Sequence, residues 1–151
     1  MIQLARPQDR AAVSRLAWQI HGLHVVWRPD IYKTAEELFP QERFDEAVKK
    51  RELYVAVVND QVVGYALVKI RRLDWNGIVP RTVMLIDEFC VEEALRRHGI
   101  GTRMLDEIKV LGKAFGCTDL QLSVYPQNDD AVSFYQKNGL MIQDIKMQMK
   151  L

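Results

Sequence analysis

The chain has 151 residues, a formal net charge of +1 and 48% hydrophobic residues, which suits one ordinary domain with its own buried core. Acidic and basic residues are interspersed, so no binding surface for nucleic acid or for an anionic membrane is predicted. No basic segment followed by an apolar run opens the chain, and no stretch approaches the roughly 20 apolar residues that span a bilayer, so we expect a cytoplasmic protein.

The first third of the chain predicts one strand and two helices. Residues 3–6 suggest a short strand, and Pro7 suits the first turn of a helix, where a missing N–H costs nothing. Apolar residues then recur at helical spacing until the pattern fades near Gly22; they are Val13, Leu16, Ala17 and Ile20. Residues 21–33 have no clean period, so we expect a loop there.

A second helix is expected next. Thr34 followed by Glu37 matches a capping box, which predicts a helix start. Pro40 should break or restart this helix. Its apolar face would be completed by Phe44, Ala47 and Val48.

The centre of the chain has the pattern of strands. Residues 53–58 and 62–70 are rich in β-branched and apolar residues and flank a turn at Asn59–Asp60, which predicts an antiparallel hairpin. A turn region over residues 73–80 then leads into a long β-branched and aromatic run over residues 81–91.

The last third predicts a long helix, a strand, a second helix and closing strands. The long helix has one apolar stripe, formed by Ile100, Met104, Leu105, Ile108, Leu111 and Phe115. A strand is expected over residues 120–125, then a helix that Gly139 would end, and one or two strands in residues 140–151. Only the strands on either side of the long helix have the crossover length that a parallel pair needs.

Residues 96–102, with the sequence RRHGIGT, are the strongest local motif. The N-terminus of a helix presents unpaired N–H groups and a partial positive charge, so a glycine-containing loop there can hold a phosphate or pyrophosphate. The spacing of the glycines fits neither the P-loop of nucleoside triphosphatases nor the three-glycine fingerprint of dinucleotide-binding proteins. A plain strand-to-helix turn with solvated Arg96, Arg97 and His98 is the alternative.

Two motifs in the right order give the sequence a family resemblance. Arg96, Gly99 and Gly101 match the Q/R-x-x-G-x-G/A signature of the GNAT acyltransferase superfamily. The second motif, after the next strand, consists of Asn128, Ala131, Phe134, Tyr135, Gly139 and Leu140. The chain thus resembles a GNAT acetyltransferase.

This resemblance implies an α/β (α+β) fold in a single domain over residues 1–151. The sheet would be mixed and mostly antiparallel, with six to seven strands, two splayed parallel strands and about four flanking helices. Acetyl-CoA would be the acyl donor, its pyrophosphate on the amides of residues 97–102 and its pantetheine along the strand at residues 89–91. The cofactor-binding residues implied are Phe89, Cys90, Val91, Arg96, Arg97, His98, Gly99, Ile100, Gly101, Thr102, Asn128 and Tyr135.

The chemistry calls for a base and an acid. An alkyl ammonium with a pKa near 10 is only about one part in a thousand neutral at pH 7, so a base is useful. Asp87 and Glu88 lie on the strand that should face the thioester; because successive strand residues alternate between faces, we expect only one of them in the cleft and favour Glu88. A surface or strand-pairing role is the alternative for both.

The resemblance makes Tyr135 the general acid that protonates the departing thiolate, against the alternative of a core aromatic. A covalent route through Cys90 is disfavoured, since the family ordinarily transfers the acetyl group directly. Cys90 and Cys117 lie far apart and have no metal-ligand spacing, so they predict inert thiols and no metal site.

The acceptor would be a primary amine on a small molecule or a protein, and its pocket would be bordered by Trp27, Asp30 and Tyr32. A homodimer is allowed by the sequence, and nucleic-acid and membrane partners are not expected. Two other functions remain open: a non-catalytic acyl-CoA sensor, and a nucleotide-binding protein that uses the loop at Gly99.

Overall fold

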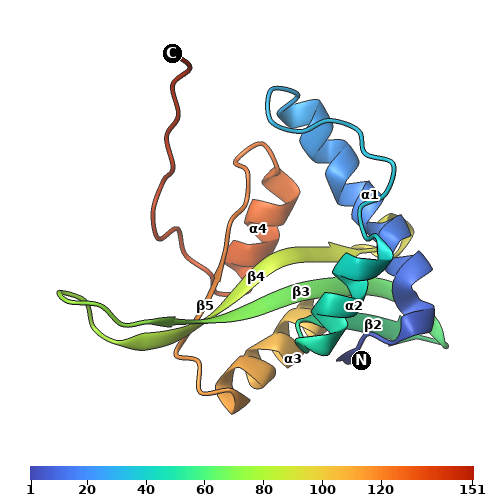
Figure 1. Ribbon diagram of the computed structural model, residues 1–151, viewed down its shortest axis with the longest axis horizontal. Coiled ribbons are helices and arrows are strands. Elements are labelled where there is room, and N and C mark those ends of the chain that lie inside the picture. The colour runs from blue at the N-terminus through green and yellow to red at the C-terminus, as the bar shows by residue number, and fades with distance from the viewer.

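The computed structural model describes residues 1–151 and has one open sheet between two pairs of helices (Figure 1). The strands are β1 Ile2–Leu4, β2 Leu53–Val58, β3 Gln61–Leu73, β4 Arg81–Val91 and β5 Asp119–Leu122. The helices are α1 Arg10–Trp27, α2 Gln41–Lys49, α3 Ile100–Ala114 and α4 Asp129–Lys137, with short 3-10 turns η1 Pro7–Asp9 and η2 Glu93–Leu95. None of these helices combines the length and the apolarity needed to cross a lipid bilayer.

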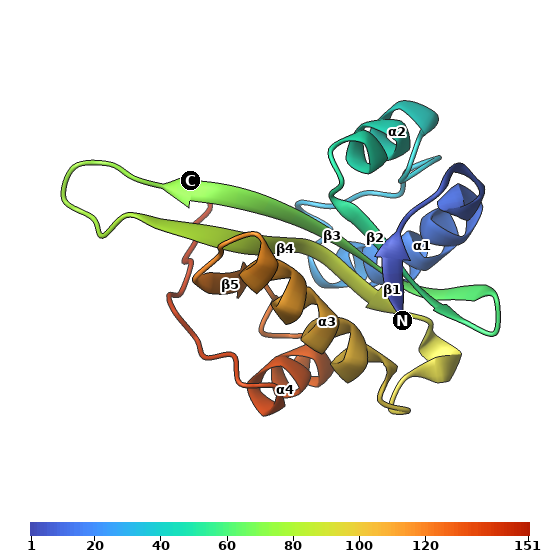
Figure 2. The ribbon, with the colours of Figure 1, turned by 90° about the horizontal axis from the view of Figure 1, so that it is seen from below.

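The five strands follow one another in the sheet in the order of the chain. All neighbours are antiparallel except β4 and β5, which run parallel, as the crossover through α3 predicts. Helices α1 and α2 cover one face of the sheet and α3 and α4 cover the other (Figure 2). The α/β class and the four helices are therefore confirmed.

Alternation of side chains along the strands gives each face its own core. On the α1/α2 face, the largest fully buried side chains are Leu16, Phe39, Phe44, Leu53 and Tyr65. On the α3/α4 face, they are Met84, Leu105 and Ile108. The middle of the sheet is thus buried on both sides. Packing against these two faces fixes the positions of α1, α3 and α4.

Two predictions about the first third of the chain are wrong. Helix α1 continues through His21 to Trp27, where a loop was expected. It ends there because Pro29 disfavours the helical conformation for Arg28. No helix begins at Thr34, since Glu37 pairs instead with Arg10 at 2.5 Å.

The sheet is also smaller than predicted. It has five strands rather than six to seven, because residues 140–151 form no strand. This segment is extended and leaves the body of the molecule (Figure 1). Its strand-like sequence has no neighbouring strand within the chain, so β5 is the last strand of the sheet.

Candidate active site

The two parallel strands pair only along part of their length. Their register runs from Val83 opposite Asp119 to Ile86 opposite Leu122, and it ends there. Strand β4 continues through residues 87–91, paired with β3 on one side only. The other edge of β4 therefore has no strand partner over these residues, which agrees with the expected splay of the two parallel strands.

The N-terminus of α3 lies next to this open edge in the chain. Arg97 (φ 65°) and Gly99 (φ +80°) both have left-handed backbone conformations, which turn the chain sharply into the helix. The first helical hydrogen bond that includes Gly99 runs from Arg103 N–H to the Gly99 carbonyl, at 3.1 Å. The N–H groups of Ile100, Gly101 and Thr102 have no helical acceptor, so they are suited to an anion.

Two side chains of this loop form hydrogen bonds to the backbone, and a third is exposed. Arg96 donates from Nε to the Val91 carbonyl at 3.0 Å, and His98 Nδ1 lies 2.8 Å from the Arg96 carbonyl oxygen. The Arg96 side chain therefore holds the loop against the end of β4, and the His98 contact lies within the loop. Arg97 is exposed and lies 3.8 Å from Asp130 at the start of α4, so its charge is at the rim.

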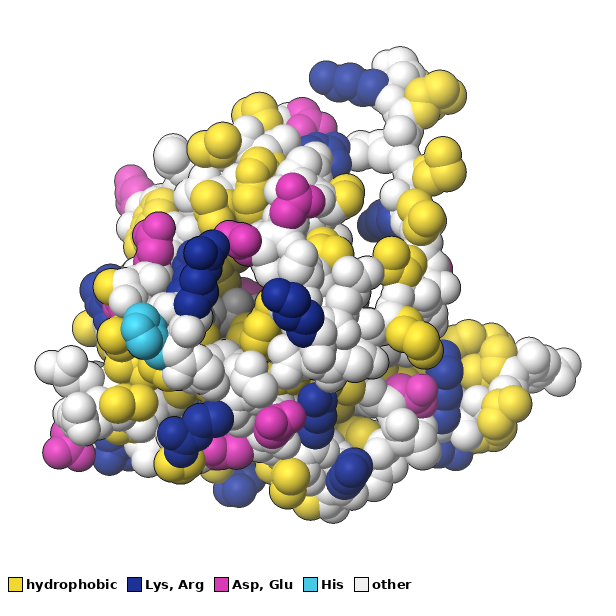
Figure 3. Space-filling view, turned by 180° about the vertical axis from the view of Figure 1, so that it is seen from behind, with side chains coloured by type: hydrophobic (Ala, Val, Ile, Leu, Met, Phe, Trp, Pro, Cys, Tyr) yellow, Lys and Arg dark blue, Asp and Glu magenta, His cyan; other side chains and the backbone are white.

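A cavity of about 440 Å³ lies between α1, the loop after β4 and the start of α4. The space-filling view shows the molecule hollowed here, with charged side chains around the rim (Figure 3). Residues that line the cavity include Gln19, Leu23, Trp27, Arg96, Asn128 and Asp130. The fold thus brings Trp27 together with two predicted cofactor-binding residues, Arg96 and Asn128. The Asn128 side chain also accepts from Ala131 N–H at 3.2 Å, which caps α4.

A β-bulge places both candidate bases on one face of the sheet. Leu67 pairs with Glu88 and Val68 pairs with Ile86, so Asp87 is the extra residue on β4. After the bulge, Glu88 points to the same α1/α2 face as Asp87, as their partners on β3 show. The expectation that Asp87 and Glu88 point to opposite faces of the sheet is wrong, because a bulge interrupts the two-residue period of a strand.

Each of these carboxylates has a fixed partner. The Tyr65 hydroxyl donates to Glu88 Oε2 at 2.6 Å, and Arg43 of α2 forms an ion pair with Glu88 Oε1. Arg43 is itself held by the Leu38 carbonyl at 2.6 Å. Asp87 pairs with Lys69 Nζ at 2.5 Å. Each carboxylate thus already forms an ion pair within the protein.

Tyr135 lies beneath the open edge of β4, among aromatic rings. Its ring contacts Phe134 (centroids 5.2 Å apart) and Phe89 (6.2 Å). Burial, with a smaller effect of Cys90, raises the pKa of Tyr135 to about 12, so the phenol stays protonated at neutral pH. Burial also raises the pKa of Cys90 to about 11, which keeps this residue a thiol.

An aromatic cluster joins α1 to the segments that follow α1 and β5. The Tyr32 hydroxyl lies 2.9 Å from the Tyr125 hydroxyl, and the His24 ring lies 5.0 Å from Tyr32 and 5.5 Å from Tyr125. Burial, followed by the charge of His21, lowers the pKa of His24, although Glu88 acts in the opposite direction. Tyr125 had no predicted role, and its position at the end of the strand expected over residues 120–125 was the only available signal.

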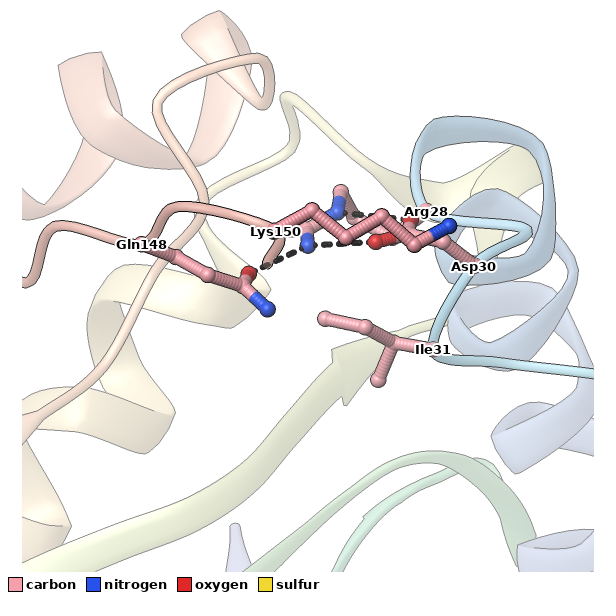
Figure 4. A pocket seen from close by; sticks show the side chains of 5 residues that line it. All are labelled: Arg28, Asp30, Ile31, Gln148 and Lys150. Atoms are coloured by element: carbon pink, nitrogen blue, oxygen red, sulfur yellow. Dashed lines mark hydrogen bonds and ion pairs between the residues drawn. The ribbon is translucent and has the colours of Figure 1, made fainter.

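Asp30, a predicted acceptor contact, lies outside this cluster. It binds the Arg28 guanidinium through two hydrogen bonds of 2.9 and 2.7 Å (Figure 4). The Arg28 hydrogen bond lowers the pKa of Asp30 to about 2. Its charge is therefore already compensated within the protein. No group of three His, Cys, Asp or Glu side chains is arranged to hold a metal ion.

The sequence profile of the acetyltransferase (GNAT) family matches residues 17–140, which include the open edge of β4, the α3 loop and α4. The chain belongs to the GNAT family. A solved structure of a tetramutant of the BH1408 protein from Bacillus halodurans is 30% identical, and the alignment covers 100% of this chain and 99% of that one with a TM-score of 0.95.

Other GNAT relatives agree with this assignment. The uncharacterized N-acetyltransferase YvbK of Bacillus subtilis is 28% identical over 102 residues, which is 67% of this chain but 60% of YvbK. GCN5-related N-acetyltransferase 7, chloroplastic, of Arabidopsis thaliana is 33% identical over 54 residues, 36% of this chain and 20% of that protein. The alignments thus span less than two thirds of either curated relative. The aminoglycoside N-acetyltransferase AAC(6')-Iy, solved in complex with CoA, shares the fold (15% identity, TM-score 0.75, covering 100% of this chain and 93% of that one).

Proposed function

We propose that this GNAT protein transfers an acetyl group from acetyl-CoA to a primary amine, by direct attack of the amine in a ternary complex. The observation that carries the proposal is the open edge of β4 over residues 87–91, which leads into a helix N-terminus with unpaired amides. This combination provides one site for an extended arm with amide groups and one for its phosphates.

The residues present fit acetyl-CoA on two points. A Cβ atom on Gly99 would meet no atom within 4 Å, so the loop leaves room for a group to approach its backbone. The unpaired N–H groups at the start of α3 and the exposed Arg97 suit a pyrophosphate. In the proposed complex, the main chain of Phe89, Cys90 and Val91 and the side chain of Asn128 bind the pantetheine arm. Bound acetyl-CoA supplies an activated acetyl thioester.

The acceptor amine must lose a proton. Glu88 is the favoured base, and Asp87 is the second candidate, each acting through water, because both lie on the face toward α1 and α2. Each carboxylate already forms an ion pair, Glu88 with Arg43 and Asp87 with Lys69. His24 is a further candidate, since its lowered pKa leaves a neutral imidazole at pH 7 close enough to Glu88 to be influenced by its charge.

The departing thiolate must gain a proton, and Tyr135 is the proposed donor. Its phenol is protonated at neutral pH and its hydroxyl forms no hydrogen bond within the protein, so the hydrogen is free to be donated. The carbonyl oxygen of the acetyl group would accept a main-chain N–H from residues 89–91. A covalent route through Cys90 is disfavoured by its raised pKa and its burial.

The acceptor would enter beside Trp27, which lines the cavity from α1. Tyr32, in the following loop and 2.9 Å from the Tyr125 hydroxyl, would be its second contact. Asp30 could bind a cationic acceptor only if the acceptor displaced Arg28. We therefore expect Asp30 to contribute less to acceptor binding than Trp27 or Tyr32.

The test is release of free CoA thiol with a panel of primary amines, using acetyl-CoA and one longer acyl-CoA as donors. Thiol release that depends on both donor and amine supports the proposal. Calorimetric binding of acetyl-CoA without turnover for any small or peptide amine would favour the acyl-CoA sensor. Stabilisation by ATP but not by CoA would favour a nucleotide-binding protein.

A further inference from the structure

Two consecutive glutamates connect the end of β4 to helix α1. The Glu92 carboxylate accepts hydrogen bonds from the side chains of Arg15 and Gln19, which lie one turn apart on α1. The Glu93 N–H donates to the Gln19 side-chain oxygen at 3.0 Å. Gln19 therefore uses both ends of its amide, the donor on Glu92 and the acceptor on Glu93.

Glu92 is held from two directions. Its backbone N–H donates to the Val63 carbonyl of β3 at 2.8 Å, while its carboxylate contacts α1. The hydrogen bond from Arg15, followed by the one from Gln19, lowers the pKa of Glu92, so the carboxylate is charged at neutral pH. Glu92 is thus a fixed point between the sheet and α1.

These contacts lie directly before the loop that leads into α3. The Leu95 N–H donates to the Glu92 carbonyl at 2.9 Å. The Arg96 N–H donates to the Glu93 carbonyl at 3.2 Å, and these two bonds close the turn η2. Only residues 96–99 separate this turn from α3. The position of the loop therefore depends on where Glu92 and Glu93 are held.

Gln19 also faces the cavity. Gln19, Leu23 and Trp27 are spaced four residues apart, so they form one stripe along α1. All three line the cavity together with Arg96. One stripe of α1 thus contacts the turn before the α3 loop at its first residue and borders the expected acceptor entry at its last.

The two α1 contacts of Glu92 differ in what they reach. The Arg15 side chain is 53% exposed and binds the Glu92 carboxylate, and an exposed ion pair of this kind contributes little to stability. Gln19 is less exposed and also binds the backbone of the turn at Glu93. Of these two side chains, Gln19 is therefore the one that acts directly on the backbone before the loop.

We propose that Gln19 is a positioning residue for the cofactor. It holds the turn η2 against α1, and through this turn it sets the position of the loop at residues 96–99. This role rests on the proposed binding of acetyl-CoA at that loop. A loop that already has its binding conformation loses less conformational entropy when the ligand binds, so release of the turn should weaken CoA binding.

The first experiment measures the affinity for CoA by titration calorimetry. Gln19→Met keeps the length of the side chain and removes both hydrogen bonds, so the dissociation constant should rise about fivefold or more. Arg15→Met is the matched control, because it removes the ion pair but leaves both Gln19 contacts. Its dissociation constant should stay within about twofold of the parent value. Parental affinity in Gln19→Met, or an equal loss in the two variants, would overturn the proposal.

The second experiment separates positioning from direct contact with CoA, because Gln19 lines the cavity. Amide hydrogen exchange is measured by NMR without any ligand. In Gln19→Met the Leu95 and Arg96 amides should exchange about tenfold faster or more, while the amide of the fully buried Tyr65 keeps its parental rate. Gln127→Met removes a glutamine that lines the same cavity from the segment before α4, and it should leave all of these rates unchanged.

The exchange rates also separate two kinds of failure. If the parent protein does not bind CoA, the proposed acetyl transfer fails, and the exchange rates still decide whether Gln19 orders the turn. If CoA binds but Leu95 and Arg96 exchange at their parental rates in Gln19→Met, the positioning role alone is refuted. An equal acceleration at Tyr65 would mean a general loss of stability and would also refute it.

Discussion

The hydroxyl of Tyr65 donates a hydrogen bond of 2.6 Å to the carboxylate of Glu88, from a position where the tyrosine is fully buried. Burial and the negative charge of Glu88 raise the pKa of Tyr65, so this donor does not ionise at working pH. Together with Arg43, it fixes the orientation of the favoured base. The bond therefore links the core of the α1/α2 face to the proposed chemistry.

Tyr65→Phe should lower the free energy of unfolding by about 1.5–3 kcal/mol, the usual contribution of a hydrogen bond to a charged group. Tyr54→Phe is the matched control, because Tyr54 is also buried, on the adjacent strand β2, and its hydroxyl has no hydrogen-bond partner in the protein. Urea unfolding measures both. If the two substitutions lower the free energy of unfolding equally, the hydrogen bond to Glu88 contributes little to it.

Glu88→Gln should reduce turnover by about 10²-fold or more if Glu88 is the base, with little change in the affinity for acetyl-CoA. Asp87→Asn is the matched substitution on the same face and should have the smaller effect. Steady-state rates of thiol release with the best amine give the comparison. The reverse order would transfer the role of base to Asp87, and normal rates in both variants would favour His24.

Two glycines of the α3 loop should differ in what they tolerate. A Cβ on Gly99 meets no atom within 4 Å, although its φ of +80° strains any side chain there, so Gly99→Glu should fold with some loss of stability. Its charge at the phosphate position should weaken CoA binding more than tenfold. A Cβ on Gly101 would lie 3.3 Å from the Phe134 ring, so Gly101→Glu should unfold at a lower temperature.

Gly116→Glu is the control for these variants, because Gly116 also has a positive φ (+74°) and open space but follows the other end of α3. Titration calorimetry with CoA measures affinity, and thermal unfolding checks the fold. If folded Gly99→Glu binds CoA as tightly as Gly116→Glu does, the loop at Gly99 is a plain strand-to-helix turn and does not bind the CoA phosphates.

The secondary structure around the α3 loop could be predicted from the sequence better than the orientation of the candidate acid–base residues could. The turn at Gly99, the helix α3 and the parallel pair β4/β5 follow from local patterns, because glycine, helical periodicity and crossover length act over short distances. The common face of Asp87 and Glu88 could not be predicted, since it depends on a bulge in the pairing with β3. The ion pair of Glu88 with Arg43 joins two elements 45 residues apart, and no local pattern encodes it.

The absence of the strands expected in residues 140–151 has a similar physical explanation. Residues 145–151 do have the alternation of a strand, so the pattern was correctly recognised. A strand, however, needs a neighbour, and alternation does not say which edge supplies it. In the structure no edge of the same chain pairs with this segment. The helix expected at Thr34 failed for another reason, because Glu37 is used by Arg10 instead of the capping box.

The stability of the protein should decrease as the pH falls below about 6.5, partly through His24. Burial lowers the pKa of His24 in the folded state, so the unfolded chain binds this proton more readily. The contribution of His24 is thus fully present above the unfolded pKa and is lost as the pH falls toward the folded one. His24→Gln should reduce the loss of stability between about pH 6.5 and pH 5, measured by urea unfolding.

Tyr135→Phe separates a general acid from a packing residue. The substitution keeps the ring between Phe89 and Phe134 and removes only the hydroxyl, which forms no hydrogen bond within the protein, so stability should change little. If Tyr135 protonates the thiolate, turnover at saturating substrates should fall by about 10²-fold or more, while the dissociation constant of acetyl-CoA stays within a few-fold. Tyr125→Phe, which removes a hydroxyl from the aromatic cluster, is the control and should retain more activity.

The pH profile adds an independent check on Tyr135. Because burial raises its pKa to about 12, the phenol remains a donor throughout the neutral and mildly alkaline range. Any decline of activity below about pH 10 must then come from another group and should persist in Tyr135→Phe. A decline at higher pH that is present in the parent protein and absent in Tyr135→Phe would identify the phenol. Parental turnover in Tyr135→Phe would assign protonation of the thiolate to water or to another side chain.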